Sequence, residues 1–121
     1  MITIQRAVTE DLHTVSILAC ALWPENSSEE MEKEYAKLLM QSDAAVYLAR
    51  EDGAAIGFAQ CQLRRDYVEG TSSSPVGYLE GIFVEEEYRR RGIAKMLLGA
   101  CEAWAKEIGC CEFASDCAYN K

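Results

Sequence analysis

The segment that decides the fold of this chain is Val84-Glu85-Glu86-Glu87-Tyr88-Arg89-Arg90-Arg91-Gly92-Ile93-Ala94. A strand is predicted to end at the beginning of this segment, and a long helix is predicted to start at its end. N–H groups in the first turn of a helix lack partners within the helix, and the helix dipole favours negative charge there. Gly92 lets an anion approach the backbone, and Ala94 keeps the first turn slim. The spacing of these residues alone is equally compatible with an ordinary charged loop that precedes a helix and binds no anion.

Strong periodic patterns flank this segment on both sides. Apolar residues recur every three or four positions from Ile93 to Ile108, which predicts a helix that ends at Gly109. The preceding run, Val76 to Val84, is nearly all apolar and predicts a strand buried on both faces. Residues 110–115 are predicted to form a short strand after the helix.

A hairpin is predicted upstream, because residues 44–50 and 54–64 read as strands joined at Asp52-Gly53. The polar composition of residues 66–75 predicts a loop. The chain begins with a predicted strand over residues 2–7.

Two helices are predicted between the first strand and the hairpin. Thr9 is the predicted N-cap of the first, which Pro24 stops, and Ser27 to Glu30 has the capping-box pattern for the second. The predicted order is therefore β-α-α-β-β-β-α-β, an α/β (α+β) fold with a mixed, mostly antiparallel sheet flanked by helices.

The length and net charge of the chain limit the classes of function that it could have. The chain has 121 residues, 50% of them hydrophobic, and a net charge of −8. These values suit one compact domain, and the acidic balance argues against nucleic acid or an anionic membrane as main partner. A cationic small molecule is compatible with it. No run reaches the ~20 apolar residues that span a bilayer, and the N-terminus lacks a signal-peptide core, so we expect a cytoplasmic protein.

The cysteines do not predict a metal site. They form no C-x-x-C pair, and His13 is the sole histidine, whereas structural zinc needs four clustered ligands. We expect reduced thiols packed as small hydrophobic groups. The six are Cys20, Cys61, Cys101, Cys110, Cys111 and Cys117.

The pattern Arg89-x-x-Gly92-x-Ala94, between the predicted strand and helix, resembles the R/Q-x-x-G-x-G/A signature of GNAT acetyltransferases. The resemblance implies acetyl-CoA as co-substrate, with no metal. It implies that the pantetheine arm pairs with the end of the preceding strand as an added strand would, at Ile82, Phe83 and Val84. The residues implied for the diphosphate are Arg89, Arg90, Arg91, Gly92, Ile93, Ala94 and Lys95.

Further segments resemble the aminoglycoside 6′-N-acetyltransferases, over essentially the whole chain. They are Trp23-Pro24, Asp66-Tyr67-Val68-x-Gly70, Ser73-Ser74-Pro75-Val76, Leu79-Glu80-Gly81-Ile82-Phe83-Val84 and Ala114-Ser115-Asp116.

The resemblance implies that Trp23 and Tyr67 pack against aminoglycoside rings, while Glu80 and Asp116 meet ammonium groups. Each residue also has a structural reading. Trp23 could cap a core helix, Tyr67 could be a surface aromatic and Asp116 could form a turn. Glu80 interrupts an apolar strand, where an unpaired carboxylate would be costly, which favours a functional role.

The implied chemistry is direct acetyl transfer to the 6′-amine, which would confer antibiotic resistance. Glu80 or Asp116 would take the amine's proton, Glu80 being the first candidate. The neutral amine would attack the thioester, and a backbone N–H near Val84 would stabilise the oxyanion.

A GNAT domain normally continues beyond the last predicted strand, so we expect residues 1–121 to be a single GNAT domain lacking its C-terminal helix and last strands. Asn120 would match the family's CoA-contacting asparagine. Relatives imply a homodimer. Two alternatives stay open: a GNAT enzyme for another amine, such as a polyamine or a protein N-terminus, and a non-catalytic fragment that self-associates through its unfinished sheet.

Overall fold

The computed structural model describes residues 1–65 and 75–115. It confirms the predicted order of strands and helices, with two short 3-10 helices in addition. The elements are β1 (Ile2–Arg6), η1 (Thr9–Asp11), α1 (Leu12–Leu22), α2 (Ser28–Leu38), β2 (Ala44–Glu51), β3 (Ala54–Arg64), β4 (Val76–Val84), η2 (Glu86–Tyr88), α3 (Ile93–Ile108) and β5 (Phe113–Ser115).

In the described part of the chain, the strands form one sheet in the order β1-β2-β3-β4-β5. Neighbouring strands are antiparallel except β4 and β5, which run parallel. The hairpin between β2 and β3 turns at Asp52 and Gly53, whose φ angles of 51° and 88° are both left-handed. Two such residues make the tight turn that matches strand twist, which confirms the prediction at Asp52-Gly53.

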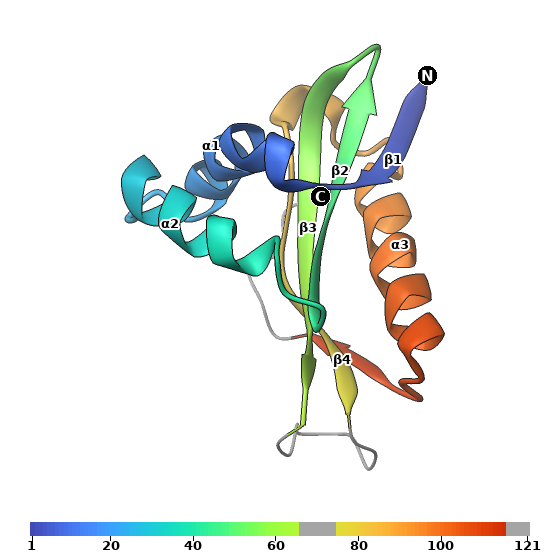
Figure 1. Cartoon of the computed structure of the whole chain (residues 1–121). Coiled ribbons are helices and arrows are strands. Elements are labelled where there is room, and N and C mark those ends of the chain that lie inside the picture. Colours follow the sequence, from blue (N-terminus) through green and yellow to red (C-terminus); the bar gives the residue numbers. More distant parts are fainter. Residues whose placement is uncertain (66–74, 116–121) are drawn as a thin grey trace.

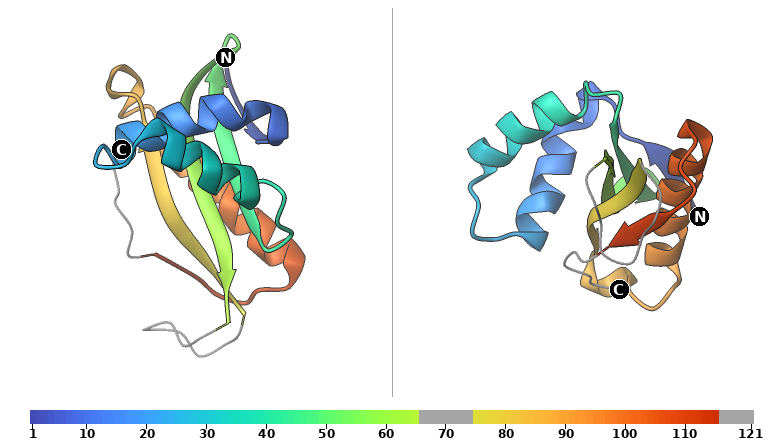
Figure 2. Two further views of the ribbon diagram at one scale, coloured as in Figure 1. Left: turned by 60° about the vertical axis from the view of Figure 1, so that its left-hand side comes forward. Right: turned by 90° about the horizontal axis from the view of Figure 1, so that it is seen from below.

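Helices cover both faces of the sheet, as Figure 1 shows: α1 and α2 lie on one face and α3 on the other. The two further views in Figure 2 show the same three layers. Strand β4 contributes to both cores, since Ile82 packs with the α3 layer and Phe83 with the α1–α2 layer. Every residue of β4 is buried except Glu80, which is half-buried, so burial on both faces is confirmed.

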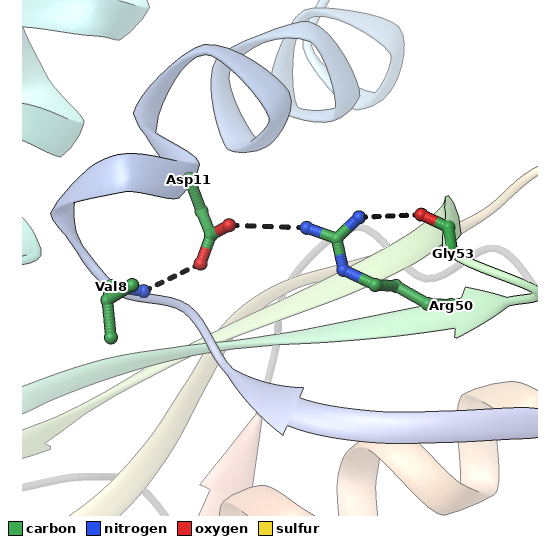
Figure 3. Close-up of polar contacts among 4 residues, drawn as sticks. All are labelled: Val8, Asp11, Arg50 and Gly53. Atoms are coloured by element: carbon green, nitrogen blue, oxygen red, sulfur yellow. Dashed lines mark hydrogen bonds and ion pairs between the residues drawn. The ribbon is translucent and has the colours of Figure 1, made fainter.

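The start of the first helix differs from the prediction at Thr9. Residues Thr9–Asp11 form η1, and α1 begins only at Leu12. The Asp11 carboxylate accepts from the Val8 N–H at 2.9 Å and from Arg50 at 3.2 Å, and Arg50 also donates to the Gly53 carbonyl at 2.9 Å (Figure 3). Asp11 thus binds the backbone N–H of Val8, the N-cap of η1, and it ties the N-terminal turn to the hairpin through Arg50.

The capping box of α2 is confirmed. The Ser27 hydroxyl accepts from the Glu30 N–H at 3.2 Å, and the Glu30 carboxylate accepts from the Ser27 N–H at 2.9 Å. The backbone N–H of Ser27 and its hydroxyl both donate to the Glu30 carboxylate, and these two hydrogen bonds lower the pKa of Glu30. Helix α2 turns Met31 and Tyr35 into the core.

The C-terminal strand is shorter than predicted, Phe113–Ser115 in place of residues 110–115. Cys61 and Cys101 are buried and Cys20 and Cys110 are half-buried, as expected of packed thiols, but Cys111 is exposed because it precedes the strand. No helix of the described segments is long and apolar enough to cross a membrane.

Candidate functional site

A β-bulge in β4 sets the geometry of the site. Gln60 of β3 lies opposite Gly81, whereas its neighbour Cys61 lies opposite Leu79, so Glu80 is the extra residue of β4. A bulge bends a strand and re-aims the side chain that it carries. Glu80 is therefore the single residue of β4 that is not fully buried.

Beside this bulge is a cavity of about 300 Å³, which we call the polar cavity. Its walls come from the end of α1, from α2, and from β3 and β4. The predicted residues Trp23 and Glu80 meet there. The lining residues also include Asn26, Met31, Glu34, Tyr35, Leu38 and Gln60.

Trp23 forms the aromatic wall of the polar cavity. Its ring lies edge-on to Phe58, with centroids 6.3 Å apart at 70°. A Cβ built on Gly81 would lie 2.5 Å from the Trp23 ring, so only glycine lets the indole pack on β4. Trp23 is also the C-cap of α1. The structural reading of Trp23 as the cap of a core helix is therefore confirmed, and its contact with an aminoglycoside ring stays a prediction.

The Glu80 carboxylate is paired, which removes the cost that an unpaired carboxylate would have in this apolar strand. Arg64 Nε and Nη2 donate to both Glu80 oxygens at 3.0–3.2 Å. The Arg64 guanidinium lies 3.9 Å from the Tyr78 ring centroid. Sequence reasoning missed Arg64 because the sequence does not fix the register between β3 and β4, and register decides which side chains meet.

Sequence reasoning also missed Glu34, Tyr35 and Gln60. Tyr35 is buried, yet its hydroxyl donates to Gln60 Oε1 within the cavity lining. Burial raises the pKa of Tyr35, with a further rise from the charge of Glu34, so the phenol is neutral. Glu34 adds a second carboxylate to the cavity.

A second cavity, of about 410 Å³, lies at the turn between β4 and α3, and we call it the turn cavity. It brings together most of the residues predicted for the diphosphate. The lining residues are Val84, Tyr88, Arg89, Arg90, Gly92, Ile93, Ala94, Lys95 and Leu98.

The backbone of the turn cavity suits an anion. Arg90 and Gly92 both have left-handed φ angles, 68° and 80°. Gly92 is the N-cap of α3 and makes no side-chain cap hydrogen bond, so it leaves the N–H groups of the first turn uncapped. Uncapped N–H groups at a helix start, beside Arg90 and Lys95, form a site for a phosphate group.

The two other arginines of the turn have structural contacts. Arg89 Nε donates to the Val84 carbonyl at 2.8 Å and thereby fixes the end of β4. Arg91 pairs with Glu51 at 3.7 Å, and its guanidinium lies 5.1 Å from the Tyr88 ring centroid. Arg91 therefore faces the hairpin and is absent from the cavity lining, unlike Arg89.

The β5 side of β4 is open toward its end. Strand β5 pairs with Gly77, Tyr78 and Leu79 only. Over residues 1–65 and 75–115, no strand pairs with Ile82 to Val84 on that side. Ile82 and Phe83 are buried and do not line the turn cavity, so their backbone, not their side chains, is what they could offer a ligand. Tyr67, Asp116 and Asn120 lie outside the described residues.

The model of the acetyltransferase (GNAT) family matches residues 12–120. The chain belongs to the GNAT acetyltransferase family. The mixed sheet with helices on both faces is the GNAT fold, and the turn cavity is formed by the GNAT signature residues Arg89, Gly92 and Ala94. In the described segments, no group of three or more His, Cys, Asp or Glu side chains could hold a metal ion.

Among the proteins to which this chain is similar are aminoglycoside N-acetyltransferases. Aminoglycoside N(6′)-acetyltransferase type 1 of Stenotrophomonas maltophilia is 41% identical over 115 residues, which cover 94% of this chain and 74% of that protein. The structure of aminoglycoside N-acetyltransferase AAC(6′)-Iy in complex with CoA superposes with a TM-score of 0.93 at 39% identity, covering 96% of this chain and 76% of that one. AAC(6′)-Iy with the bisubstrate analogue CoA-S-monomethyl-acetylneamine gives 0.92 at 39% identity, with 96% and 79% covered.

Proposed function

We propose that this chain transfers the acetyl group of acetyl-CoA to the 6′-amino group of aminoglycosides and so confers resistance to them. The observation that carries the proposal is that β4 joins two chemically different cavities: Glu80 lines the polar cavity and Val84 the turn cavity. A cationic acceptor and an anionic donor could therefore meet along one strand. The relatives crystallised with CoA and with a CoA–aminoglycoside analogue support this choice.

The donor would bind along the turn cavity. Its diphosphate suits the uncapped N–H groups of α3 together with Arg90 and Lys95, while the backbone of residues 82–84 suits the pantetheine arm. Arg89 would contribute by fixing the Val84 carbonyl. Asn120, outside the described residues, stays a prediction.

The acceptor would bind in the polar cavity. Carboxylates of Glu34 and Glu80 suit the ammonium groups of an aminoglycoside, and the Trp23 face suits its sugar ring. Tyr67 and Asp116 are proposed to complete this site.

The proposed reaction has one covalent step. A carboxylate, Glu80 or Asp116, takes a proton from the acceptor amine, directly or through water. The amine nitrogen forms a bond to the thioester carbonyl carbon, the carbon–sulfur bond breaks, and CoA leaves as its thiolate, which takes the second proton from the nitrogen so that a neutral amide and a free thiol result. A backbone N–H near Val84 would stabilise the oxyanion.

The test is thiol release from acetyl-CoA with kanamycin or tobramycin as acceptor, compared with an aminoglycoside that carries a 6′-hydroxyl group. Turnover with the 6′-amine alone would support both the reaction and its position. Equal turnover with both acceptors would contradict the 6′ assignment, and the absence of turnover would contradict the aminoglycoside activity. The homodimer and the cytoplasmic location stay predictions.

A further inference from the structure

One polar pair in the polar cavity has no part in the proton transfer proposed above. Tyr35 of α2 is only 2% exposed, yet its hydroxyl reaches across to β3 and donates to Gln60 Oε1. A buried hydroxyl needs a partner, and this bond supplies it. The bond also fixes the orientation of an amide side chain that the cavity needs.

The orientation of the amide follows from chemistry. A neutral phenol has a single O–H to donate, and the amide oxygen receives it, so the group that Gln60 can offer a ligand is its NH₂. The carboxylates of Glu34 and Glu80 line the same cavity, and their negative charge favours N–H groups over a carbonyl oxygen facing it.

Gln60 lies beside the residues that are proposed to bind the acceptor. It is paired with Gly81 at the bulge, next to Glu80, and Trp23 packs on the same glycine. A carboxylate binds an ammonium group but has no hydrogen to donate to an oxygen atom. The Gln60 NH₂ group supplies a donor next to Glu80.

We propose that Tyr35 holds the Gln60 amide as a hydrogen-bond donor to a hydroxyl or ether oxygen of the acceptor. Tyr35 is then a positioning residue, and Gln60 determines specificity. The pair makes the cavity selective for amino sugars, which carry oxygen atoms beside their amines, over polyamines, which carry none. The inference rests on the proposed function and adds a reason for its substrate class.

The experiment compares binding of kanamycin with that of spermidine, a polyamine without oxygen, to the folded full chain by calorimetry. The variant Gln60→Glu keeps the side-chain shape and still accepts from Tyr35, but it removes both NH₂ donors. We expect the ratio of the kanamycin Kd to the spermidine Kd to rise about tenfold, the effect of losing one hydrogen bond to the ligand. Using the ratio cancels much of the effect of the added charge.

Tyr35→Phe is the second variant, because it frees the amide without adding charge. It should raise the KM for kanamycin severalfold, with the Kd of CoA unchanged. Tyr47→Phe is the matched control: Tyr47 lies on β2 outside the polar cavity, and its loss should leave both values unchanged.

The outcomes distinguish a failure of the Tyr35–Gln60 role from a failure of the proposed acetyltransferase activity. If the wild type acetylates kanamycin and neither variant changes its values, the role of the pair is overturned and the enzyme assignment stands. If the wild type neither binds nor acetylates kanamycin, both are overturned. Should Gln60→Glu fail to fold by circular dichroism, Tyr35→Phe alone decides the question.

Discussion

Arg64 holds the Glu80 carboxylate through two nitrogen atoms, with N···O distances of 3.0–3.2 Å, at the bulge of β4. Glu80 is half-buried, with 19% of its side chain exposed, whereas Arg64 is exposed, at 42%. An acceptor ammonium that binds Glu80 must therefore share this carboxylate with a resident guanidinium. The pairing also fixes the direction of the carboxylate oxygens, which a proton acceptor requires.

Glu80→Gln tests whether Glu80 takes the proton. The amide keeps the shape but cannot accept a proton as the carboxylate does, so kcat for kanamycin should fall at least about 100-fold, with the Kd of CoA unchanged. The measurement is steady-state thiol release. Arg64→Gln is the control, because it breaks the same ion pair but keeps the carboxylate. An equal loss of kcat in both variants would mean that the ion pair matters and that Glu80 is not the base.

Arg90 and Gly92 give opposite expectations for stability. Gly92 has a φ of 80° and nothing lies within 4 Å of a Cβ placed there, so Gly92→Ala adds backbone strain alone, about 1–2 kcal/mol of lost unfolding free energy. Arg90→Gly removes a left-handed non-glycine residue and should not lower that free energy.

Both variants should weaken CoA binding, by about tenfold for Arg90→Gly because one charge is lost from the turn cavity. Urea titration and calorimetry provide the two readouts. Unchanged CoA affinity in Arg90→Gly would remove Arg90 from the proposed diphosphate site.

Gly81→Ala tests the packing of the Trp23 ring against β4. The new methyl group would lie 2.5 Å from the Trp23 ring, so the indole must move, at a cost of about 1–3 kcal/mol in unfolding free energy. The KM for the aminoglycoside should rise while the Kd of CoA stays the same.

Gly99→Ala is its matched control. Gly99 lies in α3 with nothing within 4 Å of its Cβ, and alanine there should raise the unfolding free energy by about 1 kcal/mol without kinetic effect. A KM that is unaltered in Gly81→Ala would show that the position of Trp23 is unimportant for acceptor binding.

Tyr35 should make the protein sensitive to alkali. Burial raises its pKa in the folded state, whereas in the unfolded chain the phenol ionises near pH ~10. Below that pH both states are protonated and the contribution is complete. As the pH rises above it, the unfolded chain releases a proton that the folded chain retains, so the unfolding free energy falls.

Urea titrations from about pH 8 to 11 should show this fall, and Tyr35→Phe should reduce its slope. Burial also raises the pKa of Tyr47, which is more exposed, so Tyr47→Phe should reduce the slope less. The same slope in the wild type and in Tyr35→Phe would contradict the assignment of the effect to Tyr35.

The sequence by itself determined the features that depend on residues close together in the chain. The Asp52-Gly53 turn, the Ser27–Glu30 capping box and the helix that starts after Gly92 each follow from local conformational preference and hydrogen bonding. The turn cavity could be predicted for the same reason, since its lining comes from the continuous stretch 84–98.

Only the tertiary structure decided the contents of the polar cavity. Its residues come from the end of α1, from α2, and from β3 and β4. Arg64 and Glu80 meet only once the register between β3 and β4 is set, and Tyr35 meets Gln60 only once α2 packs against β3. That register contains a bulge, and one extra residue in a strand reverses which face every later side chain occupies. Local conformational preferences do not predict such a shift, because the bulge is stabilised by packing between segments that are distant in the sequence.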